Sequence, residues 1–249
     1  VVVAESFEEL AREQLARWPG MVVVGQPRNV GTLPGLLLPL AHVLARDPHA
    51  RVAVFPSDHH VRDVVPFVEA VRRAIDTVDR VPARLVLVGA RADRAATDLG
   101  WVQGGRVIGR GARIVQRFVE KPPQERASAL LASGALWNTL VFAGDGDHMW
   151  DLARRARPDV VAAMDVLRED PDDRAGMRAI YARLPVADFS RQFLERIDGL
   201  GVVEMADAGW SDCGTPERLF QCLEGTQALT GLMRRLKAKE GADFLALAS

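Results

Sequence analysis

Two acidic residues follow strand-like segments at widely separated places in the sequence. Asp58 comes shortly after an apolar run that ends at Phe55, and Asp212 follows a late strand-like run in Trp210-Ser211-Asp212. Carboxylates at the carboxyl edge of a sheet can hold a divalent cation against phosphate oxygens. We therefore expect Asp58 and Asp212 to hold Mg²⁺ together or one ion each. The alternative is that each acid only caps the turn or helix after it.

A third acid, Glu120, stands at the end of another strand-like run and is followed by Lys121 and Pro122. Neighbouring residues of an extended segment point to opposite faces, so we expect Glu120 and Lys121 to serve different partners. An ammonium suits a phosphate and a carboxylate suits sugar hydroxyls, whereas a solvated strand end is the alternative. Asn138 lies inside an apolar run and must find hydrogen-bond partners, either in a neighbouring loop or in a ligand.

The histidine pair, the two cysteines and a glycine-rich stretch do not form a catalytic, metal-binding or dinucleotide-binding motif. The adjacent His59 and His60 cannot share one helical face, so a structural or solvent role is expected for both. Cys213 and Cys222 are too few for a disulfide framework or a four-thiolate zinc site, and we expect reduced thiols. The glycine-rich stretch 104–111 opens no helix and is therefore no dinucleotide fingerprint.

The elements that must position these residues alternate along the first part of the chain. Strands are predicted at Met21–Val24, Arg51–Phe55 and Arg84–Val88, and helices at Phe7–Trp18, Leu36–Ala45 and Asp63–Val78. Ser6 and Glu9 predict a capping box at the first helix. Three alternations of strand and helix predict an α/β fold with a doubly wound, mostly parallel sheet that has helices on both faces.

The middle of the chain changes pattern and predicts a β-hairpin, inserted as a lobe over the sheet. Its strands are Arg106–Ile108 and Arg113–Val119, joined through Gly109 and Gly111. Further elements are a strand at Leu136–Ala143, helices between Met149 and Ile197, a strand at Gly201–Met205 and a helix at Pro216–Leu223. We interpret residues 1–249 as a single domain.

Composition limits the class of protein. The 249 residues are 48% hydrophobic and 26% charged, which is typical of a globular protein with a sizeable core. The 32 basic and 33 acidic residues leave a net charge of -1, without the basic excess of a nucleic-acid binder. No apolar run approaches the roughly 20 residues of a membrane span, and no signal peptide is visible. We expect a cytoplasmic protein with no nucleic-acid or membrane partner.

Five motifs occur in a particular order. They are Gln-Pro-x-Asn-x-Gly-Thr at 26–32, Pro-Ser-Asp-His at 56–59, Phe-Val-Glu-Lys-Pro at 118–122, Trp-Asn-Thr at 137–139 and Trp-Ser-Asp-x-Gly-Thr at 210–215. This series resembles the sugar-1-phosphate nucleotidyltransferases, most closely the mannose-1-phosphate guanylyltransferase branch, from about Val22 to Arg218. The resemblance implies transfer of a nucleoside monophosphate from an NTP to a sugar 1-phosphate, with release of pyrophosphate. It alone favours GTP and mannose 1-phosphate.

The resemblance also implies a role for each matched residue. It implies that Gln26, Asn29, Gly31 and Thr32 bind the nucleotide and that Gln26 reads the base edge. Sugar binding falls to Gly100, Glu120 and Asn138. Asp58, Lys121 and Asp212 form the catalytic set, with the two acids on Mg²⁺ and the lysine on the sugar phosphate. The attacking oxygen is already anionic, so positioning and charge neutralisation suffice without a strong general base.

Three positions depart from the family's pattern. The glycine-rich loop that cradles the triphosphate is not found before Val1, Leu140 replaces a glycine, and Leu99 replaces a tyrosine. An alternative is therefore a non-catalytic relative that binds a nucleotide sugar or partners an active subunit. An unrelated nucleotide-binding or redox α/β protein is a third hypothesis, although no dinucleotide fingerprint is present. The oligomeric state stays open, a homo-oligomer included.

Overall fold

The computed structural model describes residues 1–239, so the last ten residues of the predicted 1–249 domain lie outside the described part. The strands are β1 (Val2–Ala4), β2 (Val24–Gln26), β3 (Arg51–Val54), β4 (Leu85–Arg91), β5 (Gly100–Gly109), β6 (Ala112–Glu120), β7 (Leu136–Asp145) and β8 (Gly201–Met205). The first helices are α1 (Glu8–Leu15), α2 (Thr32–Arg46), α3 (Val64–Thr77), α4 (Gln124–Ala132) and α5 (Gly146–Ala156). They are followed by α6 (Pro158–Met164), α7 (Val166–Glu169), α8 (Arg174–Arg183), α9 (Phe189–Gln192), α10 (Pro216–Leu223) and α11 (Gln227–Lys239).

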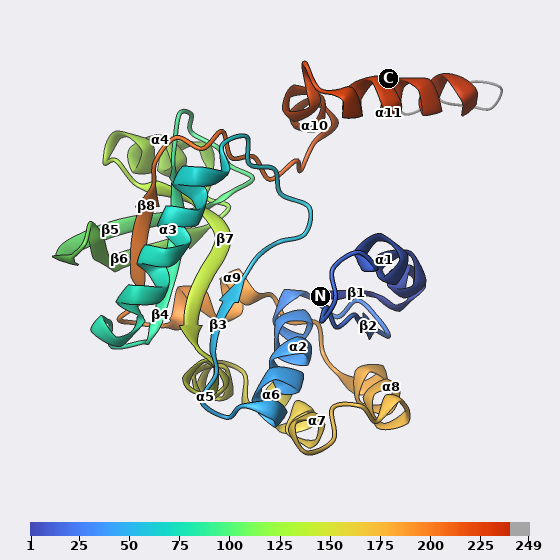
Figure 1. The fold of residues 1–249 in the computed structure, drawn as a ribbon. Helices are drawn as coiled ribbons and strands as arrows, with labels where there is room; N and C mark the ends of the chain where they lie inside the picture. Colours follow the sequence, from blue (N-terminus) through green and yellow to red (C-terminus); the bar gives the residue numbers. More distant parts are fainter. Residues whose placement is uncertain (240–249) are drawn as a thin grey trace.

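Six strands form the main sheet in the order β3-β7-β4-β8-β6-β5, and β5 also pairs with β7 (Figure 1). Only β4 and β8 run parallel within this sheet, whereas the other pairings are antiparallel. A separate two-stranded parallel sheet joins β1 and β2. The predicted α/β class is confirmed, but the prediction of a mostly parallel sheet is wrong. An apolar, β-branched run indicates a buried strand and carries no information about the direction of its neighbours.

The predicted hairpin exists as β5 and β6, and its turn uses positive φ angles at Gly109, Arg110 and Gly111. It is not a lobe over the sheet, because β6 pairs with β8 from Ala112 to Ile114. Both hairpin strands are also longer than expected, and they join the main sheet through the pairing of β6 with β8 and of β5 with β7.

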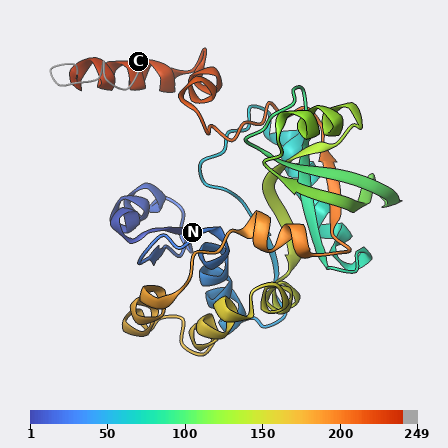
Figure 2. The ribbon, with the colours of Figure 1, turned by 180° about the vertical axis from the view of Figure 1, so that it is seen from behind.

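Helices cover both faces of the main sheet (Figures 1 and 2). Along β4, Leu85 and Leu87 pack in one apolar cluster with α2, while Val86 and Val88 pack in another with Ala70 and Ala74 of α3. This alternation is the two-residue period of a strand buried on both sides. The doubly wound part of the prediction therefore agrees with the packing.

The N-terminal helix differs from its prediction. Helix α1 begins at Glu8, and Phe7 at its start makes no side-chain cap, so the capping box of Ser6 and Glu9 is wrong. Ser6 lies instead in a short 3-10 helix. The apolar residues Phe7, Leu10 and Trp18, which recur at helical spacing, are exposed. Between residues 1 and 239, no helix has both the length and the apolar character that a membrane crossing requires.

Candidate active site

The loops after β3 and β8 meet at one edge of the main sheet. Strand β7 is antiparallel to both β3 and β4, and β8 is parallel to β4, so β3, β4 and β8 run in the same direction. The two loops pair directly, because the amides of His60 and Ser211 each donate to the other residue's carbonyl at 2.8 and 3.0 Å. Asp58 and Asp212 are therefore brought to neighbouring loops, as the sequence predicted.

The imidazole of His59 lies beside Asp58 and is influenced by the charge of Asp212. Its Nε2 is 4.0 Å from Oδ1 of Asp58, and its Nδ1 accepts a hydrogen bond from Nε1 of Trp210 at 3.3 Å. Burial lowers the pKa of His59, while the charges of Asp58 and Asp212 and a hydrogen bond to the Thr139 backbone act in the opposite direction. His59 thus has the structural role that was expected of it, and both carboxylates act on the same ring.

The two acids differ in exposure and partners. The Asp58 side chain is 83% exposed, whereas that of Asp212 is 19% exposed and pairs through Oδ1 with Nε of Arg218 at 3.1 Å. The other side of the Arg218 guanidinium contacts Oδ2 of Asp98 at 2.8 Å. Asp212 is consequently held in place by α10, while Asp58 is free to meet a solvent-borne ligand.

Neither acid caps the helix that follows it. The side chain of Asp63 accepts from the Val65 amide at the start of α3, and that of Thr215 accepts from the Arg218 amide at the start of α10. Asp212 does support its own turn, by accepting from the Gly214 amide at 3.3 Å. The helix-capping alternative is therefore wrong for both acids, and a turn-stabilising role holds for Asp212 alone.

The three residues predicted to bind the sugar come together from β5, β6 and β7. Gly100 is opposite Glu120 in the β5–β6 register, and a Cβ at position 100 would lie 2.7 Å from Oε2 of Glu120 and 3.3 Å from Cβ of Asn138. Asn138 pairs with Gly89 near the carboxyl end of β4. Its Oδ1 accepts from the Leu140 amide at 3.2 Å.

Glu120 is an unusually buried carboxyl group at this cluster. Its side chain is 11% exposed, and burial raises its pKa above the ordinary value for a glutamate. The negative charge of Asp188 raises this pKa further. The positive charges of Lys121 and Arg191 and a hydrogen bond from Ser190 lower it. The carboxyl group of Glu120 is thus surrounded by polar groups and faces the small space over Gly100.

Lys121 does not point away from Glu120. Its Nζ is 3.9 Å from Oε1 of Glu120, which corrects the expectation that the two side chains would face opposite partners. The strand ends at Glu120, and Lys121 has φ +47, a left-handed conformation that ends the two-residue alternation. Its amide donates to the Leu99 carbonyl at 3.2 Å. The ammonium group is half-exposed and remains accessible to an anion.

The predicted nucleotide loop is mostly self-supporting. Asn29 accepts from the Gly31 amide at 3.1 Å, and Thr32 accepts from the Phe189 amide at 2.8 Å. Gly31 has φ +94, and a Cβ there would come within 2.3 Å of the Ala187 carbonyl oxygen. Among the four predicted nucleotide-binding residues, Gln26 alone keeps a buried side-chain atom, Nε2, that has no hydrogen-bond partner within the described part of the chain.

The segment 187–191 was missed by the sequence analysis, and it connects the loop of Thr32 with Glu120. Asp188 and Ser190 act on the Glu120 carboxyl group, while Asp188 also caps α9 by accepting from the Arg191 amide at 2.7 Å. The available signal was the polar pair Asp188 and Ser190 on either side of Phe189, directly after the apolar residues 184–187. Arg218 and Asp98 were missed as well, and nothing in their spacing would have paired them.

The acidic loops and the sugar cluster are contiguous. Asp98, bound by Arg218, lies two residues before Gly100, and Thr139, whose backbone hydrogen-bonds His59, directly follows Asn138. A mostly apolar cavity of about 240 Å³ lies beside them, lined by His59 and Trp210 among others. Eight of the ten predicted site residues therefore neighbour one another, share a loop pair or contact segment 187–191: Asp58, Lys121, Asp212, Gly100, Glu120, Asn138, Gly31 and Thr32.

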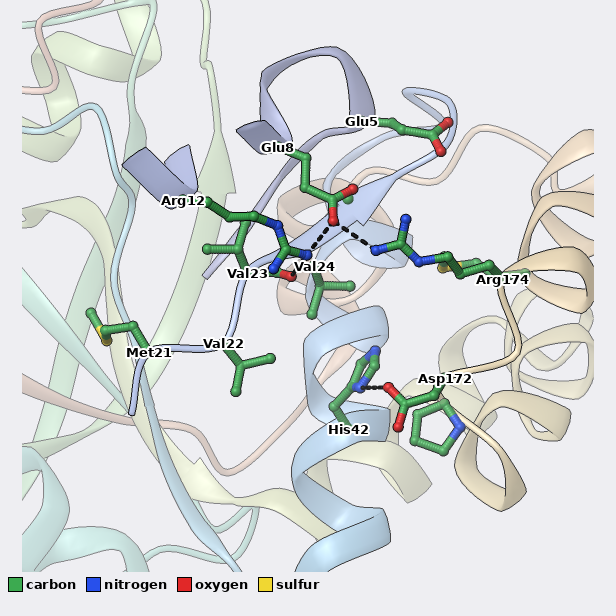
Figure 3. A pocket seen from close by; sticks show the side chains of 13 residues that line it. Glu5, Glu8, Arg12, Met21, Val22, Val23, Val24, His42, Asp172 and Arg174 are labelled. Carbon is green, nitrogen blue, oxygen red and sulfur yellow. Dashed lines mark hydrogen bonds and ion pairs between the residues drawn. The ribbon is translucent and has the colours of Figure 1, made fainter. Parts of the chain in front are cut away.

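A larger cavity of about 280 Å³ lies elsewhere, between the β1–β2 unit, α2 and the start of α8 (Figure 3). There Glu8 pairs with both Arg12 and Arg174, and Nδ1 of His42 is 3.8 Å from Oδ1 of Asp172. The charged groups Glu8, Arg12 and Arg174 are paired with one another, and none of the predicted site residues lines the cavity. We therefore do not place the active site there.

The sheet order, the helices on both faces and the polar groups at one sheet edge define an α/β protein of the nucleotide-diphospho-sugar transferase type. The model of the nucleotidyl transferase family matches residues 1–228, and the chain belongs to this family. The resemblance seen in the sequence motifs is thereby confirmed.

Individual relatives agree with this assignment. The chain is 28% identical over 232 residues to the xanthan biosynthesis protein XanB of Xanthomonas campestris pv. campestris, covering 90% of this chain and 48% of that protein. It is 29% identical over 237 residues to the mannose-1-phosphate guanylyltransferase ManC of Salmonella typhimurium, covering 89% and 48%. The chain thus spans about half the length of these relatives. A structure described as mannose-1-phosphate geranyltransferase from Thermus thermophilus superposes with a TM-score of 0.79 at 26% identity, covering 90% of this chain and 63% of that one.

Proposed function

We propose that this protein transfers a nucleoside monophosphate from an NTP to a hexose 1-phosphate and releases pyrophosphate, with GTP and mannose 1-phosphate as the favoured substrates. The observation that carries the proposal is the direct pairing of the Asp58 and Asp212 loops next to the Gly100, Glu120 and Asn138 cluster. Family membership supports the reaction class. The name of the Salmonella relative supports the choice of base and sugar.

Asp58 and Asp212 would hold Mg²⁺ in this proposal. Within residues 1–239, no group of three or more His, Cys, Asp or Glu side chains could hold a metal alone. That fits Mg²⁺, which commonly takes one or two protein carboxylates and fills its remaining positions with phosphate oxygens and water. When bound, the ion would offset charge on the α-phosphate and the leaving pyrophosphate. Asp212 would share its carboxylate between the ion and Arg218, which already fixes its orientation.

The other residues would bind and orient the two substrates. The half-exposed ammonium of Lys121 would neutralise the sugar phosphate, whose oxygen is the nucleophile. Glu120 and Asn138 would hydrogen-bond sugar hydroxyls in the space that Gly100 leaves open. The amide of Gln26, whose Nε2 has no hydrogen-bond partner among residues 1–239, can donate and accept, which suits the edge of a guanine base. Because the nucleophile is already anionic, alignment of two polyanions is the main task of the site.

A product assay tests the proposal directly. The full reading frame and residues 1–249 are each incubated with Mg²⁺, each common NTP and several hexose 1-phosphates, and nucleotide sugar and pyrophosphate are quantified. We expect GDP-hexose formation, with mannose 1-phosphate preferred. Failure of the full reading frame to yield product with every pair would disprove the enzyme. Binding of a nucleotide sugar without turnover would instead favour the non-catalytic relative.

Substitutions of the two acids test the shared cation. Asp58→Asn and Asp212→Asn each remove a ligand, and we expect losses of about a hundredfold or more in kcat/KM. Asp63→Asn is the matched control, because asparagine also caps helices well and Asp63 only caps α3. If both variants kept the activity of the control, Asp58 and Asp212 would not bind the catalytic ion. A cytoplasmic location and a homo-oligomer remain predictions.

A further inference from the structure

The two cysteines of the chain lie against each other beside the candidate active site. The Sγ atoms of Cys213 and Cys222 are 3.7 Å apart, and both side chains are free thiols with intermediate exposure. Cys213 directly follows Asp212, and Cys222 lies in the second turn of α10. The proposed function uses neither thiol.

Helix α10 makes two contacts with the Asp212 loop, one helical turn apart, and the second of them brings the thiols together. Cys222 lies four residues after Arg218, so both project from the same face of α10. Arg218 contacts Asp212 at 3.1 Å, and one helical turn further along Cys222 contacts Cys213. The loop achieves this through φ +50 at Cys213 and a hydrogen bond from the Cys213 amide to Oγ of Ser211 at 3.2 Å.

We propose that Cys213 and Cys222 form a reversible intramolecular disulfide that fastens the Asp212 loop to α10. The thiols must approach from 3.7 Å to the bond length of about 2.05 Å. Helix α10 has no buried residue, so it can move by this amount without disturbing the core. Within the described residues, the Arg218 contacts with Asp212 and Asp98 join α10 to the Asp212 loop and to the segment before β5. A covalent bridge would therefore change how firmly the loop is held.

The chemistry needs an oxidant, for which we name a small-molecule disulfide of the glutathione class. The thiolate of one cysteine attacks oxidised glutathione, forms a mixed disulfide and releases one reduced glutathione. The second protein thiolate attacks the sulfur of the first cysteine and releases another reduced glutathione. The two protein thiols lose two protons and two electrons in total, and the electrons reduce the glutathione disulfide.

The bridge does not depend on the enzymatic proposal, although its effect on catalysis does. A disulfide would keep Asp212 beside Arg218 and restrict its movement toward a cation. The covalent state is therefore measured without any substrate. If the bridge forms and no nucleotide sugar is made, only the enzymatic proposal fails.

The native full-length protein is equilibrated with oxidised and reduced glutathione, free thiols are blocked by alkylation, and the products are analysed by intact and peptide mass spectrometry. We expect a monomer that has lost two hydrogens, a linked pair of peptides carrying Cys213 and Cys222, and full reversal by dithiothreitol. Cys213→Ser should leave Cys222 with at most a single glutathione adduct. Separate glutathione adducts on both cysteines, intermolecular dimers or persistently free thiols would overturn the proposal.

The unfolded chain is the matched control for proximity. In urea, the same two cysteines meet only through random motion of the intervening eight-residue stretch 214–221. We expect the native protein to reach half-oxidation at a several-fold lower ratio of oxidised to reduced glutathione than the unfolded chain. A native protein that is harder to oxidise than the unfolded chain would show that the fold opposes the bridge, and the proposal would be wrong.

Discussion

Gly100 of β5 lies directly against the carboxyl group of Glu120 on β6: a Cβ at position 100 would stand 2.7 Å from Oε2. This distance is below any real van der Waals contact, so a side chain at position 100 must displace the carboxyl group. Glycine is therefore needed here for space, since Gly100 shows no positive φ. The proposed sugar site depends on this close approach of two strands.

The first prediction concerns this contact. Gly100→Ala should raise KM for the sugar 1-phosphate by roughly tenfold or more, because a displacement near 1 Å of a binding group is costly. The protein should stay folded, since the far end of a flexible side chain gives way. Gly105→Ala is the control on the same strand, where the nearest atom, Cβ of Gln116, would be 3.4 Å away. Equal KM values for the two variants would remove Gly100 and Glu120 from the sugar site.

The second prediction concerns the buried charge of Glu120. Burial raises the pKa of this carboxyl group in the folded protein, so folding favours its protonated form. The stabilising contribution is complete below the unfolded pKa of about 4.3 and is lost as pH rises through the higher folded value. Glu120→Gln removes the charge, so the variant should be more stable than the wild type at pH 7 and should lose this advantage near pH 4.

Urea unfolding at both pH values measures this effect. Glu204→Gln serves as the control, because Glu204 is more exposed and pairs with Arg91 at 2.6 Å. That substitution should leave stability within about 0.5 kcal/mol at either pH. A Glu120→Gln variant that is less stable than wild type at pH 7 would mean that Lys121 and Ser190 outweigh the cost of burial.

Sequence patterns were sufficient for the location of the acids and insufficient for the sheet. The Asp58 and Asp212 loops share an edge because β3 and β8 run in the same direction, which the spacing of strands and helices indicated. Strand β7 then inserts antiparallel between β3 and β4. Direction is decided by which strands finally pair, and an apolar run such as 136–143 is compatible with either direction.

The sequence also could not predict the backbone conformation at Lys121 or the contact between Arg218 and Asp98. The ion pair of Lys121 with Glu120 depends on the φ of +47 at Lys121. Lysine has no preference for this left-handed conformation, so the sequence could not predict it. The contact of Arg218 with Asp98 joins residues 120 positions apart in the sequence. Gly31, by contrast, was selected from a motif, and its φ of +94 gives that selection a physical reason.

The third prediction concerns the orientation of Asp212. Arg218→Gln removes the guanidinium that holds Asp212 at 3.1 Å and Asp98 at 2.8 Å. We expect kcat to fall by about tenfold with a higher Mg²⁺ requirement, because the carboxylate loses its fixed orientation. Arg218→Lys should recover part of the loss, since an ammonium keeps the charge but cannot contact both acids in the same geometry.

Arg91→Gln is the control for the loss of one arginine charge, because Arg91 pairs with Glu204 on the exposed surface. It should keep wild-type kcat and the same Mg²⁺ dependence. An Arg218→Gln enzyme that matches this control would show that Asp212 needs no positioning partner.

The fourth prediction concerns strain at Leu140, the position where the resembled family has glycine. Leu140 has φ +56, a left-handed conformation that costs a residue with a Cβ about 1–2 kcal/mol. Shortening the side chain should lose packing against the apolar cluster that Leu140 contacts. Leu140→Gly also relieves the strain, whereas Leu140→Ala keeps it. We therefore expect the glycine variant to be about 1 kcal/mol more stable than the alanine variant, the reverse of the usual order of these residues within regular structure. Chemical denaturation of both variants measures the difference, and an alanine variant that is equally or more stable would mean that no strain is stored at Leu140.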